Sequence, residues 1–540
     1  MSQTNEVDVV IVGAGFAGLY LIHELRKRNL SLICLEQGDN VGGTWYWNRY
    51  PGARCDAESL AYSFSFDAEL EQSWQWSERY ATQPEIERYA QHVADHFDLR
   101  RDIRFQQKVI SAVWSDSAQR WQVETDNGLK ASSKFCIMAT GCLSVPQLPG
   151  IAGLDRFQGE RFQASLWPDS ADFKGKRVGL IGTGSSGIQA VPVIAEQAAE
   201  LTVFQRTPNF SVPAENGPLD QDWVAAFKEN YRGHRDYHKR GLSSGFGDLE
   251  IEPKERTPVR ENARGLSDAE VAEILDPYWA RGGAFFLSAF AESLSDPETN
   301  AKVAEYVRNQ IRHMVKDPVT AEALCPTDHP IGTKRICVDT GYYETYNLDH
   351  VHLVNLREQP IETITETGLK TSTQEYDFDV LALATGFDAM TGALLNMDIR
   401  GEGGQALKDK WHAGPRTYLG LMAQGFPNLF MVTGPGSPSV LSNMLVSIEQ
   451  HVDWIMACLD HMQMQGLRLI TAEGQAEDSW VDHVNEVANA TLFPQGGSWY
   501  LGANVAGKPR VFMPYAAGVG AYREICDAVT ADGYRGFAFQ

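Results

Sequence analysis

Residues 7–36 read VDVVIVGAGFAGLYLIHELRKRNLSLICLE, and this stretch decides the fold. It opens with an apolar run dominated by β-branched side chains, which is typical of a buried parallel strand. A helical pattern then continues to about Asn29, and a second apolar run follows at 32–35. The order strand, helix, strand predicts a βαβ unit of a parallel sheet.

The turn between this strand and its helix has a specific glycine spacing. Gly13, Gly15 and Gly18 form a GxGxxG pattern, and Glu36 lies 23 residues after the first glycine. The glycines permit a tight turn, close approach of backbone to a pyrophosphate, and close packing of helix on strand. The helix N-terminus offers N–H donors to phosphates, and the acid can bind a ribose. An ordinary glycine-rich turn is the alternative, but the complete unit favours a dinucleotide site.

The same unit occurs a second time. Residues 177–181 and 201–204 form strand patterns on either side of a helix. The turn before that helix contains Gly182, Gly184, Ser185, Ser186 and Gly187. The position 23 residues after the first of these glycines is Gln205, and Arg206 follows it. Because a 2′-phosphate requires a cation in place of the acid, we expect FAD at the first unit and NADPH at the second. A solvent-exposed arginine is the alternative reading of Arg206.

Three further glycine turns, at 139–141, 384–386 and 432–434, follow apolar runs. Such turns let the backbone approach a cofactor or cross between domains. The second and third bring the C-terminal part of the chain back to the cofactor region. We therefore expect the first domain to be discontinuous.

Between 217 and 332 the pattern changes to helices. Residues 267–270 form a capping box, and Asp296 with Pro297 marks the start of another helix. That second helix has an apolar stripe that we expect to pack a core, formed by Val303, Tyr306, Val307, Ile311, Met314 and Val315.

Together these patterns predict an α/β protein with two Rossmann-like dinucleotide-binding domains (FAD and NADP) and a helical insertion. The predicted segments are an FAD-binding domain at 1–146 and 384–540, an NADP-binding domain at 147–216 and 333–383, and the insertion at 217–332.

Composition narrows the function. The 540 residues include 47 Lys or Arg and 70 Asp or Glu, and the formal net charge of −23 repels phosphate backbones and anionic lipids. The eight cysteines show no CxxC spacing, and no run of 18 apolar residues occurs. We therefore expect no metal site, no nucleic-acid or membrane partner and a cytoplasmic location. The sequence does not indicate an oligomeric state, and a monomer is the default expectation.

A flavoprotein with two nucleotide sites could be a disulfide reductase, a hydride-transfer oxidase or a monooxygenase. The reductases of this architecture have a CxxxxC or CxxC dithiol beside the flavin, and this sequence has neither. The absence of the dithiol excludes the reductase class.

Two segments resemble the Baeyer–Villiger monooxygenases. Residues 43–56, GTWYWNRYPGARCD, are similar to the family pattern GGxWxxxxYPGxxxD. Residues 157–168 are similar to the pattern FxGxxxHxxxWP, with Gln163 at the position of its histidine. The family histidine is structural, on the linker between nucleotide domains, so this departure affects domain motion first. Further stretches resemble the phenylacetone and steroid branch of the family, at 334–335, 434–439, 442–444 and 497–504.

The resemblance implies a monooxygenase that converts ketones to esters or lactones with NADPH and O₂ through a C4a-peroxyflavin, with sulfoxidation as a side activity. The peroxide and the alkoxide adduct are anions that exist only along the reaction path, and a fixed cation stabilises them as the charge develops. Arg335 matches the family's catalytic arginine, and Asp56 matches the acid that orients it. The alternatives are a surface ion pair and a carboxylate that stabilises a turn.

The resemblance also assigns residues to ligands. Lys334 and Arg206 match cations that hold the NADP 2′-phosphate, and the expected hydrogen-bond donors to the NADP phosphates are Ser185, Ser186 and Thr207. Thr44 and Trp45 belong to the motif beside the flavin, Trp499 matches a loop residue that closes over the nicotinamide, and Val440 with Leu441 lies where the ketone pocket is shaped. Each tryptophan could instead simply pack a core.

Two other functions remain open from the sequence. An N- or S-oxygenating flavin monooxygenase would share both nucleotide sites, and Gln163 leaves that function open. A protein that binds FAD and NADP without turnover would share both sites as well. NADPH oxidation measured with and without a ketone distinguishes the three.

Overall fold

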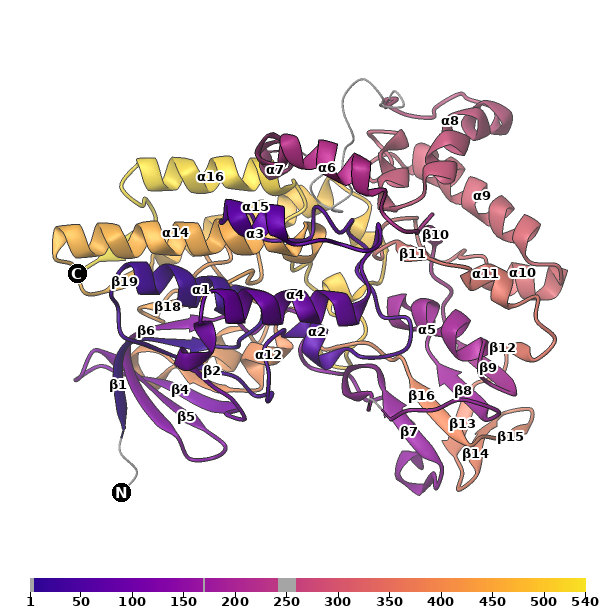
Figure 1. Ribbon diagram of the computed structural model, residues 1–540, viewed down its shortest axis with the longest axis horizontal. Coiled ribbons are helices and arrows are strands. Elements are labelled where there is room, and N and C mark those ends of the chain that lie inside the picture. Colours follow the sequence, from indigo (N-terminus) through magenta and orange to yellow (C-terminus); the bar gives the residue numbers. More distant parts are fainter. Residues whose placement is uncertain (1–3, 169, 241–258) are drawn as a thin grey trace.

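Two sheets lie side by side, each covered by helices (Figure 1). The computed structural model describes residues 4–168, 170–240 and 259–540.

The first sheet has eight strands in the order β17–β4–β5–β6–β1–β2–β3, with β18 paired to β6. Its strands are β1 (Asn5–Val12), β2 (Leu32–Leu35), β3 (Ile103–Arg104), β4 (Val109–Ser115), β5 (Arg120–Thr125), β6 (Lys130–Met138), β17 (Asp398–Arg400) and β18 (Leu429–Met431). β1 is parallel to β2 and β6, as a βαβ unit requires. β17 and β18 return to this sheet from the C-terminal part of the chain, the arrangement expected from the turn at 432–434.

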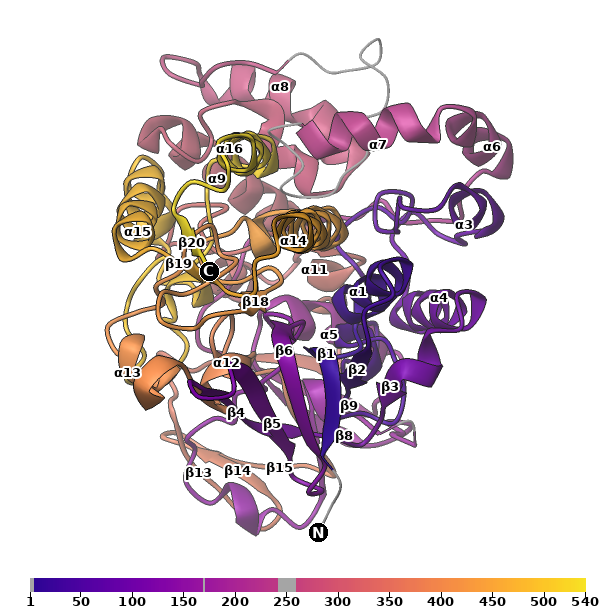
Figure 2. The ribbon, with the colours of Figure 1, turned by 90° about the vertical axis from the view of Figure 1, so that its left-hand side faces the viewer.

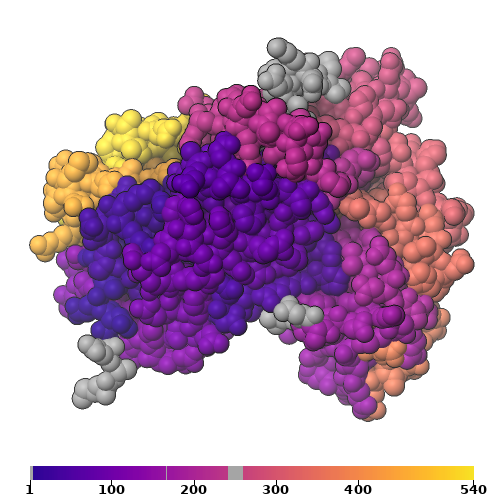
Figure 3. Space-filling view, in the orientation of Figure 1, coloured from indigo at the N-terminus to yellow at the C-terminus, as the bar shows by residue number. Residues whose placement is uncertain are grey.

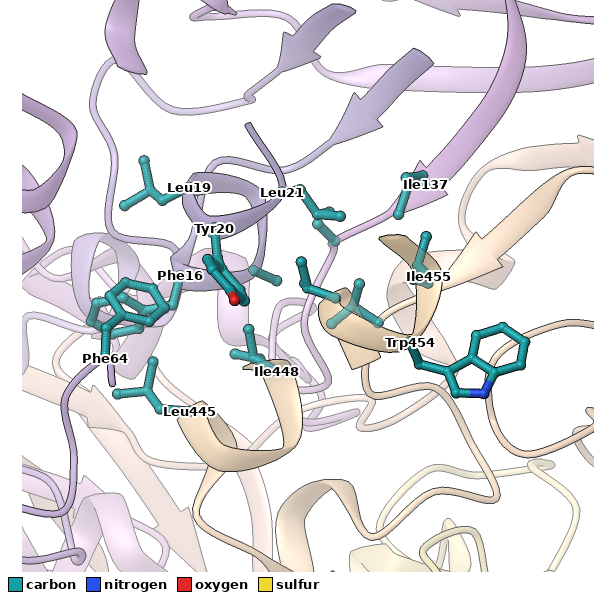
Figure 4. Packing of buried hydrophobic residues seen from close by; sticks show 14 of the residues in the cluster. Phe16, Leu19, Tyr20, Leu21, Phe64, Ile137, Leu445, Ile448, Trp454 and Ile455 are labelled. Atoms are coloured by element: carbon teal, nitrogen blue, oxygen red, sulfur yellow. The ribbon is translucent and has the colours of Figure 1, made fainter. Parts of the chain in front are cut away.

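Two helices pack on each other over this sheet, α1 (Phe16–Lys27) and α14 (Met444–Gln465). Figure 4 shows side chains of α1, among them Leu21, facing Ile448 and Ile455 of α14. Burying such a side chain contributes about 1.5–3 kcal/mol. Tyr20 also donates a hydrogen bond to Asp453, 433 positions further along the chain, at 2.6 Å. These contacts hold the two distant parts of the sequence together as one unit.

More helices cover the first sheet. Both ribbon views show α14 between the sheet and α16 (Val519–Ala531) (Figures 1 and 2). The other helices associated with this half are α2 (Thr44–Trp47), α3 (Ala68–Ser73), α4 (Gln83–His96), α12 (Gly392–Leu395), α13 (Leu407–Lys410) and α15 (Gly474–Asn489). A short antiparallel pair, β19 (Ile470–Ala472) and β20 (Phe537–Phe539), joins α14 to the C-terminus.

The second sheet has five strands in the order β12–β9–β8–β16–β7, and every neighbouring pair is parallel. Its strands are β7 (Glu160–Gln163), β8 (Arg177–Ile181), β9 (Glu200–Gln205), β12 (Val351–Asn355) and β16 (Val380–Leu383). α5 (Ser185–Ala195) connects β8 to β9 and completes the second βαβ unit. Between β12 and β16 the chain forms an antiparallel sheet of β13 (Ile361–Ile364), β14 (Gly368–Thr371) and β15 (Glu375–Asp377).

The stretch 217–332 is helical where it is described, and residues 241–258 lie outside the described part. Its helices are α6 (Gln221–Glu229), α7 (Tyr231–Arg240), α8 (Asp268–Arg281), α9 (Pro297–Met314) and α10 (Pro318–Leu324). The capping box before α8 and the Asp296 cap of α9 form as predicted. The α9 stripe packs a core, although Met314 is only half-buried. Past the insertion come β11 (Cys337–Asp339), which pairs with β10 (Ser211–Pro213), and α11 (Tyr342–Thr345).

The two sheets belong to lobes that meet in their upper parts and are separated by a hollow at the lower edge of the molecule (Figure 3). The 43–56 motif of the first lobe contacts α5 of the second lobe: Tyr50 donates to Gln189 Oε1 at 2.7 Å, and Gln189 Nε2 donates to the carbonyl oxygen of Arg54 at 3.1 Å.

Candidate active site

Both glycine turns pack against a second glycine turn. Gly13 has a φ of +106°, and a Cβ there would lie 2.5 Å from the carbonyl oxygen of Ala139. Gly182 has a φ of +115°, and its Cβ would lie 2.3 Å from the carbonyl oxygen of Ala384. No side chain fits at either position. The turns at 139–141 and 384–386 are thus built against the two predicted phosphate-binding turns, one in each lobe.

The second turn leaves room for a ligand. A Cβ at Gly184 would meet no atom within 4 Å, so the space in front of this backbone is open. At Gly187, by contrast, a Cβ would lie 2.1 Å from the carbonyl oxygen of Gly182, which is the close helix–strand packing expected of this glycine. Ser185 is exposed at the start of α5, and Ser186 beside it is half-buried. An open N-terminus of α5 fits a pyrophosphate.

The acid of the first unit lies against its glycine turn. Glu36 is buried and accepts hydrogen bonds from the backbone N–H groups of Ala14 and Gly38, both at 2.7 Å. Burial raises the pKa of Glu36, and these hydrogen bonds only partly offset the rise. Gly15 of the same turn lies close to Gly43 of the 43–56 motif, which would meet a Cβ at 3.3 Å. The motif therefore starts directly beside the predicted FAD turn.

The corresponding position of the second unit has a structural role that the sequence did not indicate. The Gln205 side chain is buried and donates a hydrogen bond to the carbonyl oxygen of Ala323, at the end of α10, at 2.6 Å. The end of β9, which has Gln205 in place of an acid, is thus tied to the helical insertion.

Three cations gather at this strand end. Arg206 is exposed, and Lys334 and Thr207 are half-buried. Arg357 forms an ion pair with Asp328 and lies 3.5 Å from the hydroxyl of Thr207. Burial lowers the pKa of Lys334; Asp328 opposes this, and the charges of Arg206 and Arg357 lower it further. A group of cations with one carboxylate fits a phosphate dianion.

Sequence reasoning missed Arg357. The residue follows β12, the neighbour of β9, and Leu356 donates a backbone hydrogen bond to Gln205 at 2.8 Å. The sequence feature that could have identified Arg357 is its position as a basic residue directly after a strand pattern, at the same sheet edge as Arg206.

Arg335 and Asp56 form the central ion pair. Arg335 Nε donates to Asp56 Oδ2 at 2.5 Å, and Nη2 donates to Oδ1 at 2.8 Å. Nη1 donates to the carbonyl oxygen of Val440 at 2.7 Å. Burial alone would raise the pKa of Asp56, but the Arg335 charge and hydrogen bonds hold it below its usual value. The carboxylate in turn keeps the pKa of Arg335 well above its usual value, so the guanidinium stays charged.

The second nucleotide turn reaches the same place. The hydroxyl of Ser185 lies 3.3 Å from the Cys337 thiol, two residues past Arg335. Asn209 donates from Nδ2 to the carbonyl oxygen of Arg335 at 3.1 Å. The predicted NADP site and the predicted catalytic pair are therefore neighbours.

The remaining predicted residues differ in their surroundings. Val440 and Leu441 are buried beside the Arg335 contact, and Trp499 is half-buried. Thr44 is exposed at the start of α2. The Trp45 indole is buried in the core of the first lobe and donates to the hydroxyl of Tyr62 at 3.0 Å, so it packs as the alternative reading proposed.

Gln163 ends β7 and pairs with Leu383 of β16. Its Nε2 is buried and has no hydrogen-bond partner among the described residues. The residue that replaces the family histidine thus sits in the edge strand of the second sheet, where the chain enters that lobe.

All eight cysteines are free and buried, so no dithiol forms. Across the described ranges, no three His, Cys, Asp or Glu side chains are grouped to hold a metal. None of the helices in these ranges is long and apolar enough to span a membrane.

Comparison with known proteins identifies the family. The profile of a family described as "Pyridine nucleotide-disulphide oxidoreductase" matches residues 10–226. A Baeyer–Villiger monooxygenase of Pseudooceanicola batsensis is 39% identical over 533 residues, which cover 98% of this chain and 95% of that protein. The chain belongs to the Baeyer–Villiger monooxygenase family.

Two solved structures of relatives support the same conclusion. Steroid monooxygenase bound to NADP is 49% identical with a TM-score of 0.93, and 99% of each chain is covered. The complex of OTEMO with FAD and NADP is 38% identical with a TM-score of 0.94, and 100% of each chain is covered. The protein is an FAD- and NADPH-dependent Baeyer–Villiger monooxygenase that acts on ketones. The predicted family, fold class and cofactors are confirmed.

Proposed function

We propose that Arg335 is the cation that stabilises negative charge on the reacting oxygen atoms during ketone oxidation, and that Asp56 orients it. When bound, FAD supplies the redox and oxygen chemistry and NADPH supplies the hydride. The observation that carries the proposal is the two-point contact between Arg335 and Asp56, beside the turn that starts α5. A guanidinium fixed in this way is already in place before the charge develops, so no reorganisation is needed when the substrate reacts.

The residues of the first unit hold FAD in this proposal. Gly13, Gly15 and Gly18 form the pyrophosphate turn, and Glu36 binds the ribose hydroxyls. Support comes from the position of the Glu36 carboxylate beside the turn. Thr44, exposed at the start of α2, extends this site toward the flavin ring. Trp45 packs in the core behind Thr44 and supports this part of the site.

The residues of the second unit hold NADPH. The turn from Gly182 to Gly187, with Ser185 and Ser186, binds the pyrophosphate. Arg206, Lys334 and Thr207 bind the 2′-phosphate, and we add Arg357 to this group. The supporting observations are that Arg357 Nη2 lies 3.5 Å from the Thr207 hydroxyl and that the charges of Arg206 and Arg357 both act on Lys334, while Asp328 pairs with Arg357.

The ketone binds between the nicotinamide and the buried pair Val440 and Leu441, and Trp499 closes the site. Val440 supports this position because its carbonyl oxygen contacts Arg335, which brings the pocket wall next to the proposed catalytic cation. The site must exclude water, because release of hydrogen peroxide competes with oxygen transfer. Ketone and O₂ are the co-substrates that the family implies.

A second activity has an observation in its favour. Phenazine N-monooxygenase of Lysobacter antibioticus is 37% identical over 541 residues, covering 99% of this chain and 96% of that protein. N- or S-oxygenation of a small heteroatom substrate is therefore our second candidate.

The proposed domain organisation follows the predicted segments, with the FAD-binding domain at 1–146 and 384–540, the NADP-binding domain at 147–216 and 333–383, and the insertion at 217–332. The strand membership of the two sheets supports these boundaries. We further propose a cytoplasmic monomer without nucleic-acid or membrane partners, supported by the net charge of −23 and by eight free thiols.

NADPH oxidation by the purified protein tests the proposed function. A panel of cyclic, aromatic and steroid ketones is compared with heteroaromatic amines and thioethers, and products are identified by gas chromatography and mass spectrometry. We expect a ketone to accelerate NADPH oxidation and to yield an ester or lactone. Turnover only with the amines or thioethers would favour the second candidate, and no acceleration by any compound would contradict both.

A further inference from the structure

The hydroxyl of Tyr500 is buried near Arg335, in one cluster with Val440, and no hydrogen bond to it is fully formed in the described part of the chain. The whole residue is 1% exposed. Burial raises the pKa of Tyr500 to about 12, and the charge and polar interaction of Arg335 oppose that rise. Buried hydroxyl groups normally have a partner, so an exception beside a catalytic cation needs an explanation.

Arg335 has donors to spare for this hydroxyl. A guanidinium has five N–H groups. Nε uses its single N–H on Asp56, Nη2 uses one there, and Nη1 uses one on the carbonyl oxygen of Val440. One N–H on each of Nη1 and Nη2 therefore remains, and a phenol oxygen can accept either of them.

The loop that contains Tyr500 is anchored at a second place. Lys508 donates to Asp388 Oδ1 at 2.5 Å and to the carbonyl oxygen of Ala389 at 2.7 Å. Asn504 donates to the carbonyl oxygen of Phe387 at 2.6 Å. The loop 497–508 is thus fastened to residues 387–389, just past the glycine turn that packs on the NADP unit.

The Tyr500 ring is held as firmly as its loop. It packs edge-on against Phe493 and Phe512, with ring centroids 5.9 and 6.2 Å apart. Ser498 caps the Tyr500 backbone N–H at 3.0 Å, and the Tyr500 carbonyl accepts from the Met513 N–H at 3.0 Å. These contacts fix the ring to its loop, so the position of the hydroxyl follows from the position of the loop.

We propose that Tyr500 is a positioning residue, whose hydroxyl accepts a hydrogen bond from the free edge of Arg335 and so links the position of the 497–508 loop to the aim of the guanidinium. The proposal rests on the proposed catalytic role of Arg335. Its consequence is that Asp56 fixes the plane of the guanidinium from one side, and the Tyr500 hydroxyl holds its free edge from the other.

The test compares Tyr500→Phe with Tyr515→Phe in the full-length, FAD-loaded protein. Tyr515 is a matched control, because it is buried in the same C-terminal segment and its hydroxyl contacts His483 at 3.2 Å instead of Arg335. For Tyr500→Phe we expect kcat for the ketone to fall about tenfold, since a small misplacement of a catalytic group is costly. KM for the ketone and anaerobic flavin reduction by NADPH should stay within twofold, and the lost turnover should appear as hydrogen peroxide. Tyr515→Phe should change none of these.

A measurement without turnover completes the test. Thermal unfolding midpoints are determined for Tyr500→Phe alone, for Arg335→Ala alone and for the double variant. If the hydroxyl acts through the guanidinium, the two shifts should be clearly non-additive, whereas Tyr515→Phe should add independently to Arg335→Ala. Should Tyr500→Phe not accumulate as folded protein, Lys508→Met releases the loop anchor and should give the same fall in kcat at unchanged KM.

The outcomes separate the two proposals. If Arg335→Ala abolishes ester formation while Tyr500→Phe behaves like Tyr515→Phe with additive midpoints, the positioning role is wrong and the catalytic role of Arg335 stands. If Arg335→Ala still forms ester, the proposed function itself fails.

Discussion

Arg335 contacts Asp56 through two parallel hydrogen bonds, although 279 positions separate the two residues in the chain. One residue follows the helical insertion and the other ends the 43–56 motif, so the contact joins the two nucleotide-binding lobes at one point. A single hydrogen bond would let the guanidinium rotate, whereas two fix its plane. The geometry therefore gives the monooxygenase a cation of fixed orientation, next to the turn predicted to bind NADPH.

The open space at Gly184 predicts that a substitution there weakens cofactor binding without impairing folding. Its backbone φ is −84°, which alanine adopts freely, and a Cβ there meets no protein atom. Gly184→Ala should therefore fold and keep its FAD, but the added methyl group should occupy the approach of the pyrophosphate. We expect the Kd for NADP⁺, measured by calorimetry, to rise at least about tenfold, or roughly 1.4 kcal/mol.

Gly217→Ala is the control for this measurement, because a Cβ at Gly217 also meets no atom within 4 Å. Equal NADP⁺ affinity in both variants and the wild type would mean that the cofactor does not approach the backbone at Gly184.

The cation group predicts the cofactor preference. We expect NADPH to be preferred over NADH by at least about tenfold, or roughly 1.4 kcal/mol. Arg206→Ala should raise KM for NADPH far more than KM for NADH, because only NADPH has the 2′-phosphate. Steady-state kinetics with both cofactors measures this, with the exposed Arg156→Ala as control. Equal losses with both cofactors would show that Arg206 does not recognise the 2′-phosphate.

Asp339 predicts a pH dependence of stability. Burial raises the pKa of this carboxyl group to about 6 from its usual 3.8, and hydrogen bonds from Ser211 and the Tyr342 N–H only partly offset the rise. Because the folded state binds the proton more tightly, the stabilisation is fully present below about pH 3.8 and is lost as pH rises through about 6. The change is on the order of 3 kcal/mol.

Unfolding of Asp339→Asn between pH 4 and 8 measures this dependence. Asparagine cannot ionise, so the wild type should lose stability relative to the variant as pH rises through about 6. Parallel stability curves for the two proteins would show that Asp339 does not titrate in this range.

Much of the fold is predictable because it follows from local pattern. The strand at 177–181 occurs as β8, and the predicted second strand at 32–35 occurs as β2. The first helix ends at Lys27, two residues before the expected Asn29, because Arg28 and Asn29 already turn the chain toward β2. The two-residue strand β3 was not predictable, since it exists only by pairing with β2.

Some residues of the candidate site were likewise predictable from the sequence, and others were not. Glycine spacing and family resemblance predicted the nucleotide turns, Arg335 and Asp56. They could not predict that Gln205 hydrogen-bonds Ala323, or that Arg357 joins the cations around Lys334. Both contacts depend on how the insertion and β12 pack beside β9, and that packing is a tertiary property with no local sequence pattern.

Oxygen transfer by Arg335→Ala is the most direct test of the catalytic role of the ion pair. Loss of one preorganised donor to a developing oxyanion typically costs about 3–4 kcal/mol, or roughly 10²–10³ in rate. Arg335→Lys should restore little, because an ammonium on a flexible stem does not reproduce the planar donors that contact Asp56.

The measurement combines anaerobic stopped-flow reduction of FAD by NADPH with aerobic analysis of ester and hydrogen peroxide in Arg335→Ala. We expect FAD and NADPH to bind, flavin reduction to persist at least in part, and NADPH to be consumed with hydrogen peroxide in place of ester. Ester formation by Arg335→Ala at a rate near that of the wild type would contradict the account.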